Sequence, residues 1–249
     1  MNMIKTLLEK NGFVFAFLFV GFIMLVSNLF AKRVTNNKIP GAAIAITAGL
    51  VLAYFGGKKG IADIPVFSGM ALLGGAMMRD FTIVATAMGA NFSEIKKAGL
   101  AGVLSLFIGI LVAFIVGGSI GYYMGYTDAK SFATIGAGAC TFIVGPITGS
   151  AIGASSDVIA ISIAIAIGVI KSILVTILTP FIAKRIGLNN PQIAMVFGGM
   201  MGTTSGVAAG LAATDPKLVP YGALTATFYT GLGCLLCPSI LYFIVDYFI

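Results

Sequence analysis

Two segments of the sequence combine glycine, hydroxyl side chains and proline within apolar surroundings. Residues 131–157 contain five Gly, seven Ser/Thr and Pro146, and residues 193–216 contain five more Gly. This mixture interrupts a helix and frees backbone N–H and C=O groups, which a membrane interior tolerates only where they line a cavity. Paired interrupted segments of this kind point to a transporter binding site. We therefore expect solute-binding chemistry in both segments.

The two segments share a local pattern. Thr148-Gly149-Ser150-Ala-Ile-Gly153 leads to Asp157, and Ser205-Gly206-Val-Ala-Ala-Gly210 leads to Asp215, with the aspartate spacing differing by one residue. The pattern suggests an inverted repeat in the C-terminal half. A second interpretation stays open, since small residues four apart also let helices pack closely. Under the first interpretation, valine at Gly149 or Gly206 harms transport more than valine at Gly109.

Helix N-termini inside the two segments are candidate anion sites. The backbone N–H groups and the helix dipole direct partial positive charge at an anion. We expect the substrate-binding residues of these helix tips to be Thr148, Gly149, Ser150, Thr203, Thr204, Ser205 and Gly206.

Two cationic residues lie inside apolar stretches. Lys171 is near the middle of residues 158–183, where an ionised side chain costs about 3 kcal/mol and needs an anionic partner. We favour an anionic substrate over a protein carboxylate as that partner. Arg79, next to Asp80, either faces a cavity and binds a carboxylate bidentately or lies at a membrane interface in a structural role.

Carboxylates end both Gly-rich segments. Asp157 and Asp215, with Ser155 and Ser156, supply the oxygen ligands that Na⁺ prefers beside unwound carbonyls. The alternative is structural, because Asp157 can cap the helix that follows it and Asp215-Pro216 resembles an ordinary turn. We predict Na⁺ as a coupling ion and no other cofactor.

Enzyme chemistry is poorly supported by the side chains present. The chain has no His, which removes the commonest metal ligand and neutral-pH acid–base group. Its three Cys lie in apolar runs, and Cys234-Leu-Leu-Cys237 lacks the strand–helix context of a redox motif. We expect a protein that is not an enzyme.

Composition sets the elements that must position these residues. Of 249 residues, 59% are hydrophobic and 9% are charged, whereas soluble domains average about 25% charged. The apolar runs are near-continuous and lack the alternation of barrel strands. We predict an all-α polytopic membrane protein with about six full spans and two re-entrant or discontinuous Gly-rich segments. The spans are 13–31 (a retained helix rather than a signal peptide), 40–57, 66–90, 98–126, 158–183 and 221–249, the last bent near Pro238.

Charges in the loops test this topology. The net charge of +7 comes mainly from short loops, which indicates membrane orientation rather than nucleic-acid binding. If all eight segments span, loop Lys/Arg number seven on the N-terminal side and six on the other. If both Gly-rich segments are re-entrant, the count is five against eight. The termini then lie outside the cytoplasm, and Asp128 and Asp215 are accessible from opposite faces.

We expect a single membrane domain with two functional regions. Residues 1–126 form the scaffold and partner interface, and residues 127–249 form the substrate- and ion-binding region. This division makes an elevator-like motion plausible by analogy of architecture alone.

The Gly-rich segments and the residues after them also carry a family resemblance. The runs PITGSAIGASSDVIAISIA (146–164) and AMVFGGMMGTTSGVAAGLAATDPKLVPYGALTATFYTGLGC (194–234) resemble the larger membrane subunit, MadM, of the two-subunit malonate:sodium symporter. The resemblance is strong in the C-terminal half and rests on layout and length in the N-terminal half. It implies Na⁺-coupled malonate uptake across the bacterial cytoplasmic (inner) membrane. It also implies a smaller hydrophobic partner subunit, MadL, and leaves a higher oligomer open.

The alternative function is the membrane subunit of a sodium-translocating decarboxylase, which also joins carboxylates to Na⁺. The absence of His and the short chain argue against it.

Overall fold

The computed structural model of the chain describes residues 9–35, 39, 41–57, 60–73, 92–154 and 158–249. These residues form helices, with one isolated β-bridge between Gly57 and Gly60. Four helical stretches are long and apolar enough to cross a membrane: Gly12–Val34, Gly99–Tyr123, Ala160–Ile182 and Pro216–Phe248. An all-helical membrane protein is therefore confirmed. The predicted number of full spans stays a prediction, since residues 74–91 lie outside the described ranges.

Residues 1–85 form one compact unit. Its helices are α2 (Gly12–Val34), α3 (Gly41–Tyr54), the short 3₁₀ turns η1 (Ile61–Asp63) and η2 (Pro65–Phe67), and α4 (Gly69–Leu73). Helix α2 packs on α3 and α4, and Phe15, Phe19 and Phe67 form an aromatic cluster beside them. Most large side chains of α2 are apolar and exposed, as lipid or protein neighbours within a membrane require.

Residues 86–249 form the second compact unit. Helix α6 (Phe92–Tyr123) belongs to it because α6 packs on α7 (Ala129–Cys140) and α10 (Pro191–Met201). By these contacts α6 belongs with the helices that follow it, and the predicted functional division at residue 126 stays a prediction. Within α6, Gly99 takes a left-handed backbone conformation (φ 62°) that kinks the helix at the start of its apolar part.

Each Gly-rich segment forms two short helices. The first consists of α7 and α8 (Val144–Ala151), joined by residues 141–143, and we call it hairpin 1. The second consists of α10 and α11 (Thr204–Ala212), joined by residues 202–203, and we call it hairpin 2. Hairpin 1 closes tightly, since Gly138 and Gly145 touch and the Lys130 ammonium lies 3.9 Å from where a Cβ on Gly153 would be.

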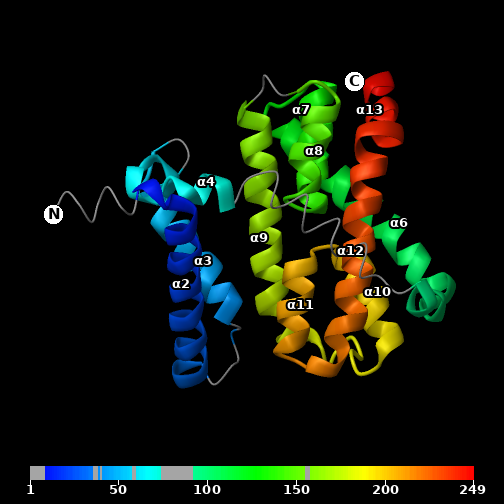
Figure 1. Cartoon of the computed structure of the whole chain (residues 1–249). Coiled ribbons are helices and arrows are strands. Elements are labelled where there is room, and N and C mark those ends of the chain that lie inside the picture. The colour runs from blue at the N-terminus through cyan, green and yellow to red at the C-terminus, as the bar shows by residue number, and fades with distance from the viewer. Residues whose placement is uncertain (1–8, 36–38, 40, 58–59, 74–91, 155–157) are drawn as a thin grey trace. The chain divides into compact units, whose positions relative to one another are not determined.

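The long helix α9 (Val158–Ile182) connects the two hairpins. Figure 1 shows hairpin 1 beside the end where α9 begins and hairpin 2 beside the end where α9 stops. After hairpin 2, the 3₁₀ turn η3 (Pro216–Leu218) leads into α12 (Val219–Leu236), which packs on both α10 and α11 and runs back toward hairpin 1. The order hairpin–helix thus occurs twice.

The last helix passes Pro238 through a π-helical turn. This turn (η4, Cys237–Leu241) connects α12 directly to α13 (Tyr242–Phe248). Proline lacks the N–H that an α-helix needs, and a widened turn absorbs the mismatch. The predicted bend is therefore a π turn within one continuous span.

Two apolar cores stabilise the second unit. One lies around hairpin 1 and includes Phe114, Ala137, Val144, Tyr229 and Cys237. The other lies around hairpin 2 and includes Val175, Phe197, Val207, Leu211 and Ala226.

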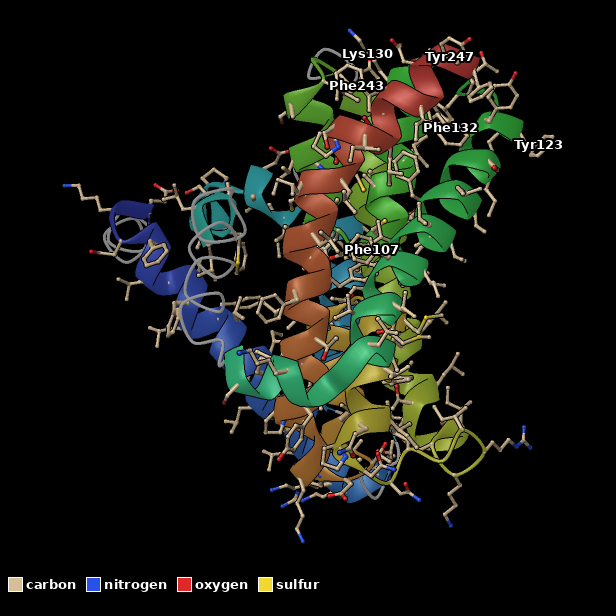
Figure 2. All side chains as sticks on the ribbon, turned by 90° about the vertical axis from the view of Figure 1, so that its right-hand side faces the viewer. Phe107, Tyr123, Lys130, Phe132, Phe243 and Tyr247 are labelled. Carbon is tan, nitrogen blue, oxygen red and sulfur yellow. The ribbon has the colours of Figure 1, made fainter. Side chains whose placement is uncertain are left out.

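Aromatic side chains mark the hairpin 1 end of the unit. Tyr123, Phe243 and Tyr247 are exposed there, at the same end as Lys130 (Figure 2). Exposed aromatic residues beside a lysine are typical of a membrane–water interface.

Candidate functional site

Both hairpin breaks touch one face of α9. The break of hairpin 1 lies against Gly168, where an added Cβ would collide with the backbone of Phe142. The break of hairpin 2 lies against Ser172, whose hydroxyl makes a short hydrogen bond with that of Thr203. Residues four apart on a helix lie one above the other. The two breaks therefore meet α9 about one helical turn apart.

Lys171 lies between these two contacts. Its Nζ donates to the carbonyl oxygens of Ala139 and Cys140, both at 2.9 Å. These are the last two residues of α7, where carbonyls lack helical partners and the helix dipole is negative. The ammonium also lies 5.4 Å from the ring centre of Tyr229, within cation–π range. The protein partner of Lys171 is thus the end of a broken helix, and the expected substrate partner stays a prediction.

An apolar groove of about 340 Å³ leads to Lys171. Side chains of α9 and α10 line it, including Leu174, Phe197 and Met201, and Lys171 is the charged residue among its lining side chains. Two hydrogen bonds leave one N–H of the ammonium group for another acceptor. Lys171 thus brings a cation with donor capacity to the wall of an otherwise apolar groove.

The break of hairpin 2 is a capped helix N-terminus. Thr203 Oγ1 accepts from the Gly206 N–H (3.4 Å), so the expectation that Thr203 to Gly206 begin a helix is confirmed. Thr204 approaches Thr227 (3.5 Å between hydroxyls), and Ser205 is exposed. On α9, Thr176 donates to the Ser172 carbonyl (2.7 Å) and approaches that of Gly206 (3.5 Å).

The corresponding expectation for hairpin 1 is wrong. Helix α8 begins at Val144, so Thr148, Gly149 and Ser150 lie in its second half rather than at its N-terminus. The reason is Pro146, which is tolerated in a first helical turn and lets the helix start earlier than the glycines suggest.

Two hydroxyls in hairpin 1 stand apart from the other threonines of the second unit. Thr134 and Thr148 are fully buried, and their hydroxyls have no hydrogen-bond partner among the described residues. By contrast, Thr176, Thr225 and Thr230 each bond the carbonyl four residues earlier.

The packing interpretation of the glycines holds as well. Gly206 and Gly210 face Ser172 and Thr179 of α9 at distances that leave no room for a Cβ. In hairpin 1, Gly149 faces Thr134 and Ile161, whereas Gly153 ends the hairpin with a left-handed backbone (φ 71°). Close packing and a helix N-terminus therefore coexist in hairpin 2.

The predicted Na⁺ ligands and Arg79 are described only in part. Arg79, Ser155, Ser156 and Asp157 lie outside the described residues. Asp215 is a half-buried turn cap whose Oδ1 accepts from the Lys217 N–H (3.0 Å). Among the described residues, no group of three or more Cys, Asp or Glu gathers to hold a metal ion. Both interpretations of Asp157, as a Na⁺ ligand and as a helix cap, stay open, and for Asp215 the geometry favours the turn.

Sequence reasoning missed Ser172 and Tyr229. Tyr229 is fully buried, donates to the Gly109 carbonyl (3.1 Å) and packs on Gly202 at the end of α10. A signal was present, since Tyr229 follows Asp215 by the same 14 residues by which Lys171 follows Asp157. The spacing makes Tyr229 the counterpart of Lys171 in the second half of the repeat.

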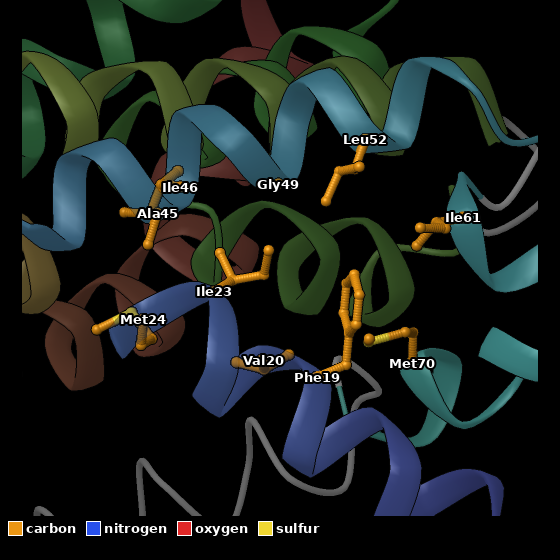
Figure 3. A pocket seen from close by; sticks show the side chains of 10 residues that line it. All are labelled: Phe19, Val20, Ile23, Met24, Ala45, Ile46, Gly49, Leu52, Ile61 and Met70. Atoms are coloured by element: carbon orange, nitrogen blue, oxygen red, sulfur yellow. The ribbon is translucent and has the colours of Figure 1, made fainter. Parts of the chain in front are cut away.

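The first unit has a pocket of different chemistry. It measures about 230 Å³ and is lined by apolar residues of α2, α3, η1 and α4, such as Phe19, Ile46 and Met70 (Figure 3). No charged or hydroxyl side chain lines it, so it does not suit an anion.

Comparisons with known proteins concern the chain as a whole. Nothing among curated proteins and nothing among solved structures matches the chain. A family model, described as the malonate/sodium symporter MadM subunit, matches residues 4–249. That match covers nearly the whole sequence. The matched residues include the broken helices and the apolar helices that a membrane transporter requires. The chain belongs to the family of malonate/sodium symporter MadM subunits.

Proposed function

We propose that this chain carries the substrate pathway of a Na⁺-coupled malonate uptake system, with the anion bound where the two hairpin breaks meet α9. The observation that carries the proposal is Lys171, a cation at mid-helix beside both breaks. Malonate is a dianion and needs positive charge and N–H donors within a membrane.

Two helix N-termini add to the charge of Lys171. Helix α8 begins beside Gly168 and α11 begins beside Ser172. One helical turn rises about 5.4 Å, a separation that the two carboxylates of a three-carbon diacid can bridge. Two of the three N–H groups of the Lys171 ammonium bond carbonyls of α7. The third is left to donate to one of the two malonate carboxylates. The substrate-binding residues then include Lys171, Thr203, Thr204, Ser205 and Gly206, with Arg79 still to be tested.

Hairpins that enter from opposite membrane faces fit this arrangement. Hairpin 1 and the chain end lie at one end of the second unit, with hairpin 2 at the other (Figure 1). Lys130 lies at the first end, and Lys184, Arg185 and Lys217 follow helices at the second. The positive-inside rule then puts hairpin 2 on the cytoplasmic side and both termini outside.

The wider system follows the family. Its subunit name supports a second subunit, which we propose to be small and hydrophobic, and a location in the bacterial inner membrane. Helices α2 and α3 would hold the partner, while the hairpin region moves together with α6, which packs on both hairpins. The membrane potential contributes about 2.3 kcal/mol per charge per 100 mV, so Na⁺ entry can drive dianion uptake.

Labelled malonate in proteoliposomes tests the proposal. The chain, purified with its proposed partner, should accumulate unchanged carbon-14 malonate when Na⁺ is outside and not when K⁺ replaces it. Release of labelled CO₂ would indicate the decarboxylase function instead. Flux that does not saturate with malonate would indicate a channel, and either result overturns the proposal.

A further inference from the structure

The two halves of the repeat end their first helices in the same way. In α7, the Ala137 carbonyl accepts from the cap residue Thr141 (3.2 Å), and in α10 the Gly198 carbonyl accepts from the cap residue Gly202 (2.9 Å). In each helix the next three carbonyls have no partner within the helix. The Ala139 and Cys140 carbonyls of α7 therefore correspond to those of Met200 and Met201 in α10.

The two helix ends differ in the side chain that approaches them. At α7 the ammonium of Lys171 takes both carbonyls, which shows that this position binds a cation. At α10 the corresponding residue is Tyr229, whose ring packs on Gly202 and whose hydroxyl donates elsewhere, to Gly109. The other cationic side chains described in the second unit lie in loops or near outer helix ends, at residues 96, 130, 184, 185 and 217. Lys171 lines the same groove as Met201, but its ammonium bonds the end of α7, so no described side-chain cation hydrogen-bonds the end of α10.

Two hydroxyl groups lie just beyond this helix end. Thr203 follows Met201 by two residues, and its hydroxyl contacts that of Ser172. Both side chains are buried, with exposed fractions of 0% for Thr203 and 3% for Ser172. Carbonyls at half-helix C-termini together with hydroxyls form the oxygen environment in which transporters coordinate Na⁺.

We infer that a Na⁺ ion binds at the C-terminal end of α10, coordinated by the carbonyls of Met200 and Met201 and the hydroxyls of Thr203 and Ser172. The Lys171 ammonium then neutralises the helix end in hairpin 1, and the Na⁺ ion neutralises the corresponding helix end in hairpin 2. The inference rests on the proposed function for its choice of Na⁺. It assigns the ion to four residues that are distinct from the aspartates that follow each hairpin.

The loaded site is electrically balanced. Lys171 and one Na⁺ contribute two positive charges on neighbouring faces of α9, since adjacent helical residues point about 100° apart. A malonate dianion between them cancels both. Each cation alone repels the other across a low-dielectric region, so substrate and ion should each strengthen the binding of the other.

Ser172→Ala tests the site, with Ser105→Ala as the matched control. Ser105 is also buried on a helix, but its hydroxyl donates to the Gly102 carbonyl of its own helix (2.7 Å). The purified complex is heated in increasing NaCl, with choline chloride holding the ionic strength. Ser172→Ala should raise the Na⁺ concentration for half-maximal stabilisation by about 10-fold or more, as expected for a weakened metal site. Ser105→Ala should shift it less than about 2-fold, within the few tenths of a kcal/mol expected of a neutral change.

Thr203→Ser, which keeps the hydroxyl, should bind Na⁺ nearly as the original chain does, and Thr203→Val should not. Equal Na⁺ responses in Ser172→Ala and Ser105→Ala overturn the site.

The failure of this inference and that of the proposed function are distinguishable. If malonate uptake is absent but Ser172→Ala still removes the Na⁺ response, the proposed function fails and the site stands. If uptake is Na⁺-dependent with the same half-saturating Na⁺ in Ser172→Ala, the site fails and the function stands.

Discussion

Lys171 joins a full charge to the free carbonyls of a broken helix. The structure places its ammonium on two carbonyl oxygens, and the same group has capacity for one more acceptor. The ammonium can therefore bond the end of α7 and the substrate at the same time, because both roles require a positive charge at this position.

Lys171→Met should abolish malonate uptake while the two-subunit complex still assembles. Methionine keeps the length of the side chain but removes both the charge and the hydrogen bonds to Ala139 and Cys140. Uptake in proteoliposomes and size-exclusion chromatography measure the two effects. Lys130→Met, at an exposed lysine near the start of α7, should transport normally. Substantial transport by Lys171→Met would remove this residue from the site.

Thr148→Val and Thr134→Val should leave the thermal unfolding temperature unchanged or raise it. A buried hydroxyl without a partner costs about 1–3 kcal/mol, and valine has nearly the same shape. Thr176→Val should lower the temperature, because its hydroxyl has partners. Equal destabilisation by Thr148→Val and Thr176→Val would mean that the buried hydroxyl of Thr148 has a partner beyond the protein.

At the scale of the elements, hairpin 2 depends on glycine for its approach to α9. A Cβ on Gly206 would lie 2.8 Å from the Ser172 carbonyl oxygen, which is a backbone atom and cannot rotate away. Gly206→Val should therefore displace α11, lower the unfolding temperature and abolish transport.

Gly231 provides the control that this experiment needs. Nothing lies within 4 Å of where its Cβ would be, so Gly231→Val should be tolerated. Gly109, the control suggested by sequence alone, is unsuitable because its Cβ would lie 2.5 Å from the Gly199 carbonyl oxygen. Equal tolerance of valine at positions 206 and 231 would contradict close packing of α11 on α9.

Asp128 caps the N-terminus of α7 and should make hairpin 1 sensitive to acid. Burial acts to raise the pKa of this carboxyl, but hydrogen bonds from Ser131 and nearby backbone N–H groups outweigh it and hold the pKa below its usual 3.8. A lowered pKa in the folded state means stability that is present above pH 3.8 and is lost as the pH falls through the folded pKa.

Thermal unfolding between about pH 2 and pH 6, which spans the unfolded pKa and the lower folded pKa, measures this contribution. Asp128→Asn keeps a good cap without a titrating group and should flatten that part of the profile. Asp128→Ala should cost about 1 kcal/mol at neutral pH. Identical acid profiles for the original chain and Asp128→Asn would show that the cap carboxylate does not contribute.

The sequence predicted the broken helices because Gly, Ser, Thr and Pro are local signals. It did not give the start of α8, since Pro146 fits either the break or the first helical turn. Nor did it give the contact of Lys171 with the end of α7, which joins residues about 31 positions apart and depends on how the hairpin folds. Tyr229 was missed because an aromatic residue in an apolar span looks like ordinary packing until its neighbours are known.

At the scale of the whole molecule, the second unit consists of two apolar cores separated by a polar layer. The cores surround the two hairpins, and the layer contains Lys171, Ser172 and Thr203. Composition and hydropathy predicted the membrane class and the apolar spans. They could not predict that α6 packs with the hairpins, since its sequence reads as a plain span.

Labelling from each face of the membrane tests the proposed topology. Lys130 and Lys217 are both exposed. Lys130 lies at the start of hairpin 1, and Lys217 lies just after hairpin 2. An impermeant maleimide should modify Lys130→Cys from outside intact cells and Lys217→Cys only after the membrane is opened. The native Cys140 and Cys237 are buried and Cys234 is partly exposed, so the unsubstituted chain measures the background. Modification of both positions from the same side would contradict opposed hairpins.

Hairpin 1 and hairpin 2 make their polar contacts with consecutive residues of one helix, Lys171 and Ser172. A helix resists compression along its axis, so a shift of α9 that loosens one hairpin disturbs the other in the same step. Slippage, in which Na⁺ passes without malonate or malonate without Na⁺, requires one hairpin to release alone. Anchoring both to neighbouring residues links the two movements mechanically and so opposes wasteful leak of the ion gradient.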